Sequence, residues 1–458
     1  MFKILLLIAT VFISANASLI GSNFSQRDLQ ILKELDIDPA YITDYKLQKT
    51  YNRYLQNIQL KYVNRFNRAS LFVPKVKEIL REEGLPETFL YLAMAESSFT
   101  LDAKSHARAT GMWQFMYGTA KNLGLKNDIY VDERMDIVKS TYAATKHLKY
   151  LHGQFGKWYL AAVAYNCGQG RVIEAITRAT IDMYEDENGK NNDKSQQIKK
   201  YRRTISLYQQ KRVKFRELNN IYKEILTWDV KPDIYELLME QKKIRRQYLP
   251  EESRGYIRKI ISLAMMNNQS FVTENDYSHI RNIGVTSPIA TVKVKGGLHL
   301  KNIASAIGME YRDLKMLNKH IVRNVIPTYN EDYEIYIPYS RLSIFNQNKM
   351  NIEPTKYKVH IVKRGDNLFD IGKKYGISYK AIKSFNKLKS NRLALKQKLV
   401  IPFVEGTGLK TKNYYVKNGD TLLSIAKMHR IELDKLMNDN NLKTSLIKKG
   451  DKLVITYR

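Results

Sequence analysis

Residues 89–96 read Phe-Leu-Tyr-Leu-Ala-Met-Ala-Glu, and Ser97, Ser98 and Phe99 follow. An apolar run that ends in a single carboxylate is typical of a buried helix that reaches a polar boundary. At that place Glu96 loses hydration, which disfavours its charged form and raises the pKa of the carboxyl group. The negative end of a helix dipole acts in the same direction. Glu96 is therefore either the solvated end of a buried helix or a general acid that keeps its proton near neutral pH.

The chain around this run is long enough for several domains. Its 458 residues exceed the usual size of one domain, and 44% hydrophobic residues are enough to form real cores. Residues 73–176 form a dense helical pattern with few prolines. The polar run 182–197 has almost nothing to bury, so we expect an exposed loop there. A charged helical stretch follows over 201–247, and another helix opens near residue 250.

A repeat begins near residue 290. Three groups of four residues recur at the same spacing: Leu300, Ile303, Leu314 and Asn318; Leu368, Ile371, Ile382 and Asn386; Leu422, Ile425, Leu436 and Asn440. Strand-like alternation opens and closes each unit, while the centre has helical spacing, which predicts a small βααβ fold. We expect residues 340–355 and 404–411 to be linkers.

The N-terminus has the pattern of a cleaved signal peptide. Lys3 precedes a short apolar core, and Ala15, Asn16 and Ala17 fit a cleavage site. The apolar core is too short to span a bilayer, and no other segment is long and apolar enough to do so. We therefore expect an exported, periplasmic protein without a transmembrane helix in its mature form. No cysteine near this site could carry a lipid, which argues against membrane anchoring.

The composition limits the chemistry. The single cysteine, Cys167, rules out an internal disulfide and a cysteine-based metal site, and the eight histidines lack metal-ligand spacing. We expect no metal and no cofactor. The net charge of +31 favours polyanionic partners such as nucleic acid, anionic lipid or an acidic wall polymer. Because no nucleic-acid module accompanies the charge, we do not expect nucleic acid to be the partner.

The last two repeats resemble the LysM family. The segments Gly365-Asp366-Asn367-Leu368 and Gly419-Asp420-Thr421-Leu422 look like the opening of that module, and Asn386 and Asn440 fall where the family has its second-helix asparagine. The resemblance implies binding of glycans that contain N-acetylglucosamine, such as peptidoglycan. The resemblance points to Gly365, Asp366, Asn386, Gly419, Asp420 and Asn440 as residues of the glycan-binding modules. The alternative is that the spaced residues are only core positions of the repeat, which we expect for the apolar ones, so the binding is expected of each module as a whole.

The first repeat departs from this pattern. Gly297-Leu298 stands where Gly-Asp is expected, and four extra residues precede the closing strand. We interpret it as a degenerate LysM-like unit.

Four segments resemble the goose-lysozyme-like lytic transglycosylases, which cleave peptidoglycan. These are Glu96-Ser97-Ser98-Phe99, Gly111-Met112-Trp113-Gln114-Phe115-Met116, Ala164-Tyr165-Asn166-Cys167-Gly168-Gln169-Gly170-Arg171-Val172, and Glu252-Ser253-Arg254-Gly255-Tyr256-Ile257. They occur in the order of the family, which also joins this domain to C-terminal LysM repeats in some members. The resemblance implies that Glu96 is the sole catalytic acid and base. It implies substrate-binding roles for Ser105, Gly111, Met112, Gln114, Tyr165, Asn166 and Tyr256.

The residue types fit such a groove. Gln114 and Asn166 carry both donor and acceptor atoms for sugar hydroxyls and N-acetyl groups. Tyr165 and Tyr256 offer an apolar face for a sugar ring and a hydroxyl that can reach Glu96. Cys167 replaces a small residue of the family pattern, and we interpret it as a packed thiol.

The expected architecture is multidomain, with a mainly α, lysozyme-like catalytic domain followed by small α+β (βααβ) LysM modules. The expected boundaries are 1–17 for the signal peptide, 18–72 for an N-terminal helical segment, 73–180 for the catalytic domain, 181–247 for a polar loop and charged helical insertion, 248–285 for the last catalytic helix, 290–338 for the degenerate unit, and 357–402 and 413–456 for the LysM modules.

Three functions compete. A lytic transglycosylase would cleave between N-acetylmuramic acid and N-acetylglucosamine and leave 1,6-anhydromuramyl ends. A goose-type lysozyme on the same fold would hydrolyse that bond, and a catalytically silent protein would only bind the wall. The expected partners are peptidoglycan strands, together with other enzymes of the cell wall. Around Glu96 the matching segments offer no second acid, in contrast to glycosidases with two carboxylates. Asp102 is nearby in the sequence, but we expect it in a polar loop.

Overall fold

The computed structural model describes residues 24–241, 244, 246–273, 288–327, 332–352, 357–375, 379–402, 410–429, 431–440, 442 and 444–457. The expected signal peptide lies outside these residues. Two compact units are present: the first comprises residues 1–126 and 133–290, and the second comprises residues 127–132 and 291–458. Over the described ranges, no helix combines the length and apolar character needed to cross a bilayer.

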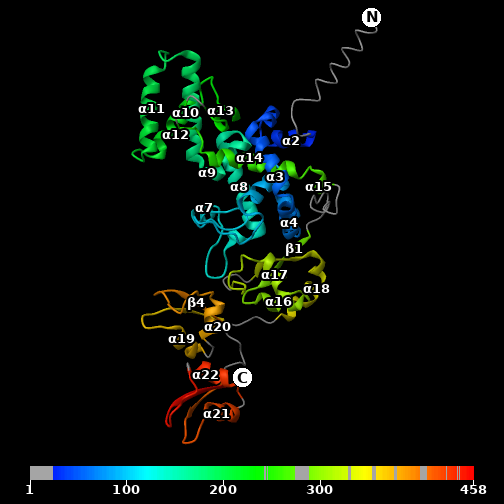
Figure 1. The fold of residues 1–458 in the computed structure, drawn as a ribbon, viewed down its shortest axis with the longest axis vertical. Coiled ribbons are helices and arrows are strands. Elements are labelled where there is room, and N and C mark those ends of the chain that lie inside the picture. The colour runs from blue at the N-terminus through cyan, green and yellow to red at the C-terminus, as the bar shows by residue number, and fades with distance from the viewer. Residues whose placement is uncertain are drawn as a thin grey trace, which may run out of the picture. The chain divides into compact units, whose positions relative to one another are not determined.

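The first unit is helical (Figure 1). Its elements are α2 (Gln26–Glu34), η1 (Pro39–Thr43), α3 (Tyr45–Asn57), α4 (Gln59–Ala69), α5 (Val73–Glu82), α6 (Phe89–Ser97), α7 (Tyr117–Asn122), η2 (Glu133–Met135), α8 (Ile137–Phe155), α9 (Trp158–Cys167), α10 (Gln169–Asn188), α11 (Ser195–Gln209), α12 (Phe215–Ile225), α13 (Ile234–Leu238), α14 (Glu251–Met266) and α15 (Ser270–Thr273).

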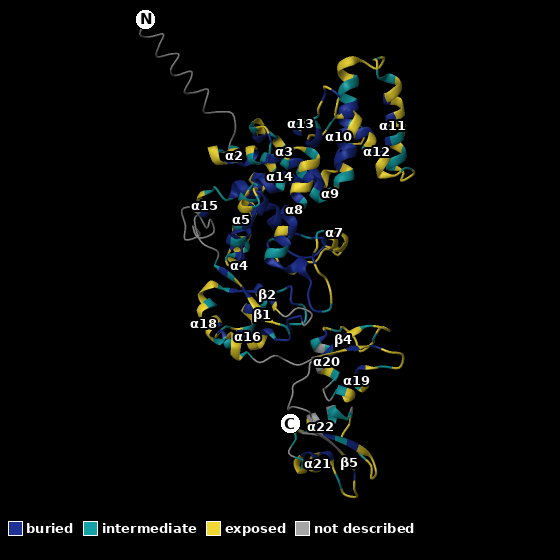
Figure 2. Cartoon of the chain, turned by 180° about the vertical axis from the view of Figure 1, so that it is seen from behind, coloured by how far each residue is buried: buried dark blue, intermediate teal, exposed yellow. Residues whose placement is uncertain are grey.

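The core of this unit lies around α6 and α14. Residues 89–95 of α6 are all buried, which explains why this helix is apolar on every side. Residues 253–266 of α14 are buried apart from Gly255 and Lys259, so α14 is also a central helix, as its dark colour in Figure 2 shows. The two helices pack against each other and bring the end of the opening segment next to the fourth sequence motif.

Local signals in the sequence define the ends of the helices around this core. The Asp136 carboxylate accepts hydrogen bonds from the N–H groups of Val138 and Lys139 at 3.0 and 2.8 Å, which caps the start of α8. Gly156 ends α8 in the left-handed conformation, with φ of 68°. Pro250 precedes α14, which therefore opens where the sequence predicts a helix.

The polar run 182–197 is mostly helical, so the prediction of a loop was wrong over most of its length. Helix α10 continues to Asn188 and α11 begins at Ser195. Helices α10, α11 and α12 lie side by side in Figures 1 and 2. The reason is tertiary: Tyr184 and Tyr201 contact Trp228, with ring centroids 4.8 and 6.4 Å apart, and this aromatic contact stabilises a segment of low local hydrophobicity.

The second unit contains three βααβ modules, which confirms the predicted fold class. The first has β1 (Ile289–Lys295), α16 (Leu300–Ala306), α17 (Tyr311–Leu317) and β2 (Asp332–Pro338). The second has β3 (Tyr357–Ile361), α19 (Leu368–Tyr375), α20 (Tyr379–Phe385) and β4 (Lys398–Pro402). The third has β5 (Lys410–Tyr415), α21 (Leu422–Met428), α22 (Leu433–Asp439) and β6 (Lys452–Tyr457). The two strands of each module pair with each other, antiparallel in the second and third modules.

The first module has two additions that the sequence pattern did not indicate. Residues 340–351 form the end of η4 (Tyr339–Arg341), α18 (Leu342–Asn348) and η5 (Lys349–Asn351), so the prediction of a linker there was wrong. Phe345 is buried and explains why this segment folds onto the module. In addition, residues 127–132 belong to the second unit, where the N–H of Val322 donates to the carbonyl of Tyr130 at 2.7 Å.

Candidate active site

Glu96 is the penultimate residue of α6, next to a strained turn. Ser98 caps the helix with φ of 54°, and Phe99 follows with φ of 60°. Two successive non-glycine residues with positive φ are uncommon and mark a backbone that the surrounding structure holds in place. Phe99 is buried, which fixes the turn. The carboxyl group of Glu96 therefore has a defined direction at the end of a rigid, buried helix.

Helix α14 supplies the polar neighbours of Glu96. The hydroxyl of Tyr256 donates a hydrogen bond to Glu96 Oε1 at 2.6 Å. Lys259 is one helical turn further on and donates from Nζ to the carbonyl of Ala95 at 2.6 Å. The sequence analysis did not identify Lys259, although its spacing of three from Tyr256 places both on one face of the helix.

Burial raises the pKa of Glu96 above that of an ordinary glutamate. The hydrogen bond from Tyr256 and the charge of Lys259 act in the opposite direction, and the nearby charge of Glu252 adds to the increase. Burial also raises the pKa of Tyr256 and of Tyr165 well above the usual value, and the charge of Glu96 contributes to both shifts. Both phenols therefore stay protonated near Glu96 and can only donate or accept as neutral hydroxyls.

Glu252 corrects an expectation from the sequence. We expected no second acid beside Glu96, yet the exposed Glu252 is close enough to act on its pKa. Glu252 belongs to the fourth motif, and the sequence analysis overlooked it because only the fold brings α14 next to α6.

The second motif forms a turn that hydrogen bonds connect to the neighbouring helices. Gly111 has φ of 92°, and a Cβ atom there would lie 1.8 Å from the carbonyl oxygen of Arg134, so a glycine is required. Gln114 also has a positive φ, and its amide nitrogen donates to the carbonyl of Gly111 at 2.7 Å. Trp113 is fully buried and donates to the hydroxyl of Thr141 at 3.0 Å.

Backbone carbonyls of the same motif accept from helices α6 and α9. The hydroxyl of Ser97 donates to the carbonyl of Met112 at 2.8 Å, and the hydroxyl of Tyr165 donates to the carbonyl of Trp113 at 2.7 Å. The Met112 side chain is fully buried, so it is a core residue and presents no side-chain surface to a substrate. These two hydrogen bonds hold the motif beside the helix that ends at Glu96.

The third motif turns sharply at Gly168, which has φ of 85°. Asn166 accepts a hydrogen bond at Oδ1 from the hydroxyl of Ser253 at 3.0 Å. Ser253 is one turn before Tyr256 on α14, so Asn166 and Glu96 are both linked to the same helix. Burial raises the pKa of the Cys167 thiol, which fits a packed side chain.

Ser105 lies apart from this group. It is exposed, and its hydroxyl accepts from the N–H of Ala109 at 3.0 Å in a short turn. The carbonyl of Ala103 accepts from the N–H of Gly111 at 2.9 Å and connects this turn to the second motif. The structure thus joins Glu96, Tyr256, Tyr165, Asn166 and the Gly111–Gln114 turn by hydrogen bonds or charge, whereas Ser105 is connected only through the backbone.

The residues expected to bind glycan in the LysM modules have structural roles. Asn386 is almost fully buried; its side chain donates to the carbonyls of Ile382 and Val400, and accepts from the N–H of Val400. Asn440 makes the same three bonds with Leu436 and Val454, and Asn318 makes them with Leu314 and Tyr336. The shared asparagine therefore locks the second helix to the closing strand, in the degenerate module as well.

The two aspartates fasten the opening turns. Asp366 accepts from the N–H of Lys363 and pairs with His360, and these contacts hold its pKa below the usual value. Asp420 accepts from the N–H of Lys417 and the hydroxyl of Tyr414, with the same effect on its pKa. Gly365 and Gly419 have φ of 90° and 88°, which these turns require. The side chains of these acids and asparagines thus build the module.

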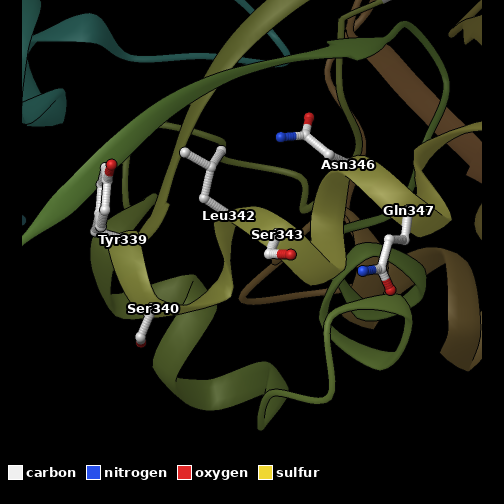
Figure 3. Close-up of a pocket in the computed structure, with 6 residues that line it drawn as sticks. All are labelled: Tyr339, Ser340, Leu342, Ser343, Asn346 and Gln347. Carbon is white, nitrogen blue, oxygen red and sulfur yellow. The ribbon is translucent and has the colours of Figure 1, made fainter.

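Two open hollows lie on the surface, one beside α4 in the helical unit and one beside α18 in the first module. The first has a volume of about 690 Å³, lies in the helical unit and is lined by Ser98 and by residues of α4: Lys61, Asn64, Arg65, Asn67 and Arg68. The second, of about 550 Å³, lies along η4 and α18 of the first module, where Tyr339, Ser340, Leu342, Ser343, Asn346 and Gln347 line it (Figure 3). Within the described ranges, no group of three or more His, Cys, Asp and Glu side chains could hold a metal ion.

Family patterns match the middle of the helical unit and all three modules. The pattern of the transglycosylase SLT domain matches residues 76–186. The LysM pattern matches residues 360–402 and 414–456, and the pattern described as "Lytic transglycosylase MltD, LysM-like domain" matches residues 289–354. Helices α2 to α4 and α11 to α15 lie outside these matches.

Individual relatives support the same assignment. Membrane-bound lytic murein transglycosylase D of Escherichia coli (strain K12) is 24% identical over 413 residues, which cover 85% of this chain and 76% of that protein. Cell wall-binding protein YocH of Bacillus subtilis (strain 168) is 36% identical over 20% of this chain and 32% of its own length. Peptidoglycan transglycosylase gp16 of Escherichia phage T7 is 33% identical over 30% of this chain and 10% of its own length.

Proposed function

We propose that this chain, an SLT-type lytic transglycosylase with C-terminal LysM domains, cleaves the β-1,4 bond between N-acetylmuramic acid and N-acetylglucosamine in peptidoglycan. The product is a 1,6-anhydromuramyl end. The observation that carries the proposal is the buried Glu96 carboxyl, which has a raised pKa and a phenol 2.6 Å from its Oε1. Its LysM domains bind peptidoglycan and keep the substrate close to the catalytic domain.

Glu96 acts first as an acid. Because burial raises its pKa, the carboxyl group keeps a proton at a pH where an exposed glutamate has lost it. It gives this proton to the glycosidic oxygen as the bond from that oxygen to C1 of the muramyl sugar breaks. The N-acetylglucosamine portion leaves with a free 4-hydroxyl group.

Glu96 acts next as a base. The carboxylate formed in the first step is stabilised by the hydrogen bond from Tyr256 and by the charge of Lys259, which both favour the ionised form. It takes the proton of the muramyl C6 hydroxyl while the C6 oxygen bonds to C1. Water is not consumed, and the acid is restored for the next cycle.

The residues around Glu96 orient the strand. Gln114 donates from its amide nitrogen to the carbonyls of Ala103 and Gly111. We assign its side-chain oxygen the role of an acceptor for an N-acetyl N–H. The amide of Asn166 and the exposed hydroxyl of Ser105 are the further polar contacts that we assign to substrate. Tyr165 holds the Gly111–Gln114 turn in place, because its hydroxyl donates a hydrogen bond to the carbonyl of Trp113.

A hydrolytic lysozyme is the second candidate, and Glu252 is the observation that favours it. A second carboxylate near the acid can activate water in glycosidases that use two acids. Glu252 is exposed and acts on the pKa of Glu96, so it could take that role if water reaches C1. The product distinguishes the two: hydrolysis leaves a reducing end where transglycosylation leaves an anhydro end.

The decisive experiment is digestion of purified sacculi with mass analysis of the products. We expect anhydromuramyl ends from the wild type, no release from Glu96→Gln, and unchanged products from Glu252→Gln. Reducing ends in the wild-type products, together with loss of activity in Glu252→Gln, would refute the transglycosylase and support the lysozyme. If the wild type binds the sacculi but releases no products, the result would support a catalytically silent wall-binding protein. Since the substrate is a wall polymer, we place the protein outside the cytoplasm.

A further inference from the structure

Helix α4 lies outside the region that matches the SLT domain, yet it borders the end of α6. Its apolar face holds Phe66, whose ring centroid is 5.3 Å from that of Phe99 and 6.4 Å from that of Tyr91. Tyr62 on the same face is fully buried. This packing fixes α4 beside the strained turn that follows Glu96.

The other side of α4 is cationic. Lys61, Arg65 and Arg68 line the hollow of about 690 Å³, together with Asn64, Asn67 and Ser98. Ser98 is two residues after Glu96 and caps the same helix. We use the name cationic pocket for this hollow and its six lining residues.

No carboxylate of the described residues lies within salt-bridge distance of Lys61, Arg65 or Arg68, although many cations elsewhere in the helical unit are paired. Burial lowers the pKa of Arg65, and the charge of Arg68 contributes in the same direction. Three like charges around one open hollow repel one another unless an anion enters.

The cationic pocket is also electrostatically connected to the acid. Burial lowers the pKa of Lys259, the charge of Glu96 raises it, and the charge of Arg65 lowers it. Lys259 therefore lies within the range of both groups. The pocket therefore borders the end of the helix that carries Glu96.

Resting on the proposed function, we propose that the cationic pocket binds a carboxylate carried by the muramyl sugar of the strand at Glu96. Peptidoglycan carries such groups at every second sugar, either as the free carboxylate of the lactyl group or as carboxylates of the stem peptide. An arginine side chain can hold a carboxylate by paired N–H donors, and an asparagine amide can donate a further hydrogen bond to it. The pocket thus sets the register of the strand, since it admits the muramyl side group only when the correct bond lies at Glu96.

The test compares the full chain with a triple variant, Lys61→Gln, Arg65→Gln and Arg68→Gln. A matched control carries Lys199→Gln, Lys200→Gln and Arg203→Gln, which remove three exposed charges from α11. Turnover is measured on soluble, uncrosslinked strands, because turnover reports only the strand in the catalytic groove and not binding by the LysM modules. Three substrates are used: strands with stem peptides, strands stripped by an amidase, and strands whose carboxylates are blocked as ethanolamides.

On strands with free carboxylates we expect the triple variant to raise KM about tenfold, the size of several partly exposed charge pairs together, while kcat stays within about twofold. On blocked strands the wild type and the variant should have equal KM values. An effect on peptide-bearing strands alone identifies the stem peptide as the source of the carboxylate, and an effect on stripped strands identifies the lactyl group.

An equal KM for the triple variant and the α11 control on strands with free carboxylates would overturn the inference, as would an undiminished effect on blocked strands. A different result refutes the proposed function: the products would carry reducing ends in place of anhydro ends, whatever the KM values are. If the wild type has no turnover, calorimetric binding of the same strands to Glu96→Gln and to Glu96→Gln with the triple variant decides the inference: equal affinities refute it.

Discussion

Replacing Asn386 by alanine should unfold the second LysM module rather than remove a glycan contact. The side chain of Asn386 donates to the carbonyls of Ile382 and Val400 at 2.9 and 2.7 Å and accepts from the N–H of Val400 at 2.8 Å. Asn386 and Val400 are 2% and 0% exposed, so water cannot replace these bonds in the folded module.

The magnitude follows from this geometry. A buried hydrogen bond contributes about 1 kcal/mol, and a buried backbone group left without a partner costs about 1 to 3 kcal/mol. Loss of three bonds, with the N–H and carbonyl of Val400 left unpaired, gives a destabilisation of roughly 3 to 5 kcal/mol. A module of about 45 residues has a total stability of roughly 2 to 7 kcal/mol, so the variant module should be largely unfolded.

Hydrogen–deuterium exchange of the full chain, read by mass spectrometry, measures this directly. In Asn386→Ala, peptides from residues 379–402 should lose protection, while peptides from residues 431–457 keep it and act as an internal control. Asn346→Ala, an exposed asparagine of the first module, should change nothing. Loss of binding to sacculi with full protection of residues 398–402 would refute the structural role and would return Asn386 to the glycan site.

Three further predictions concern the helical unit. Tyr256→Phe removes a bond that favours ionised Glu96 and should move the alkaline limb of kcat/KM to higher pH; Glu252→Gln removes a like charge and should move it to lower pH, so shifts of the same sign would contradict the assignment. Glu96→Gln mimics the protonated acid that the fold prefers: because the folded pKa is raised, wild-type stability is complete below the ordinary glutamate pKa and decreases as pH rises through the folded value. The melting temperature of Glu96→Gln should therefore exceed that of the wild type at pH 8 and equal it near pH 4. A lower melting temperature of the variant at pH 8 would contradict this. Gly111→Ala should cost about 3 kcal/mol or more in denaturant unfolding, because its Cβ would meet the carbonyl oxygen of Arg134, whereas Gly153→Ala in α8 meets no atom and should be neutral or stabilising.

The LysM motif residues show that a sequence pattern can predict a fold correctly while the roles expected of its residues differ from those in the structure. The spacing of Asn318, Asn386 and Asn440 predicted three related modules, and the structure confirms the βααβ fold of each. Asn386 and Asn440 were expected at the glycan site, yet both, like Asn318, bridge the second helix and the closing strand of their module. A sequence repeat reports that a residue is required at a position, and only the burial and partners of that residue tell whether the fold or the ligand requires it.

The sequence alone indicated the helical domain and the modules, and it singled out Glu96 as the candidate acid, because these inferences depend on local patterns: an apolar run, a repeated spacing and four short motifs. Tertiary structure decided what depends on segments far apart in the chain. It placed Lys259 and Glu252 near Glu96, and it brought the cations of α4 to Ser98. It also made helices of the polar residues 182–188, through the contacts of Tyr184 and Tyr201 with Trp228. The pKa of a buried acid and the charge of a pocket are sums over neighbours in space, and the order of residues does not specify those neighbours until the chain is folded.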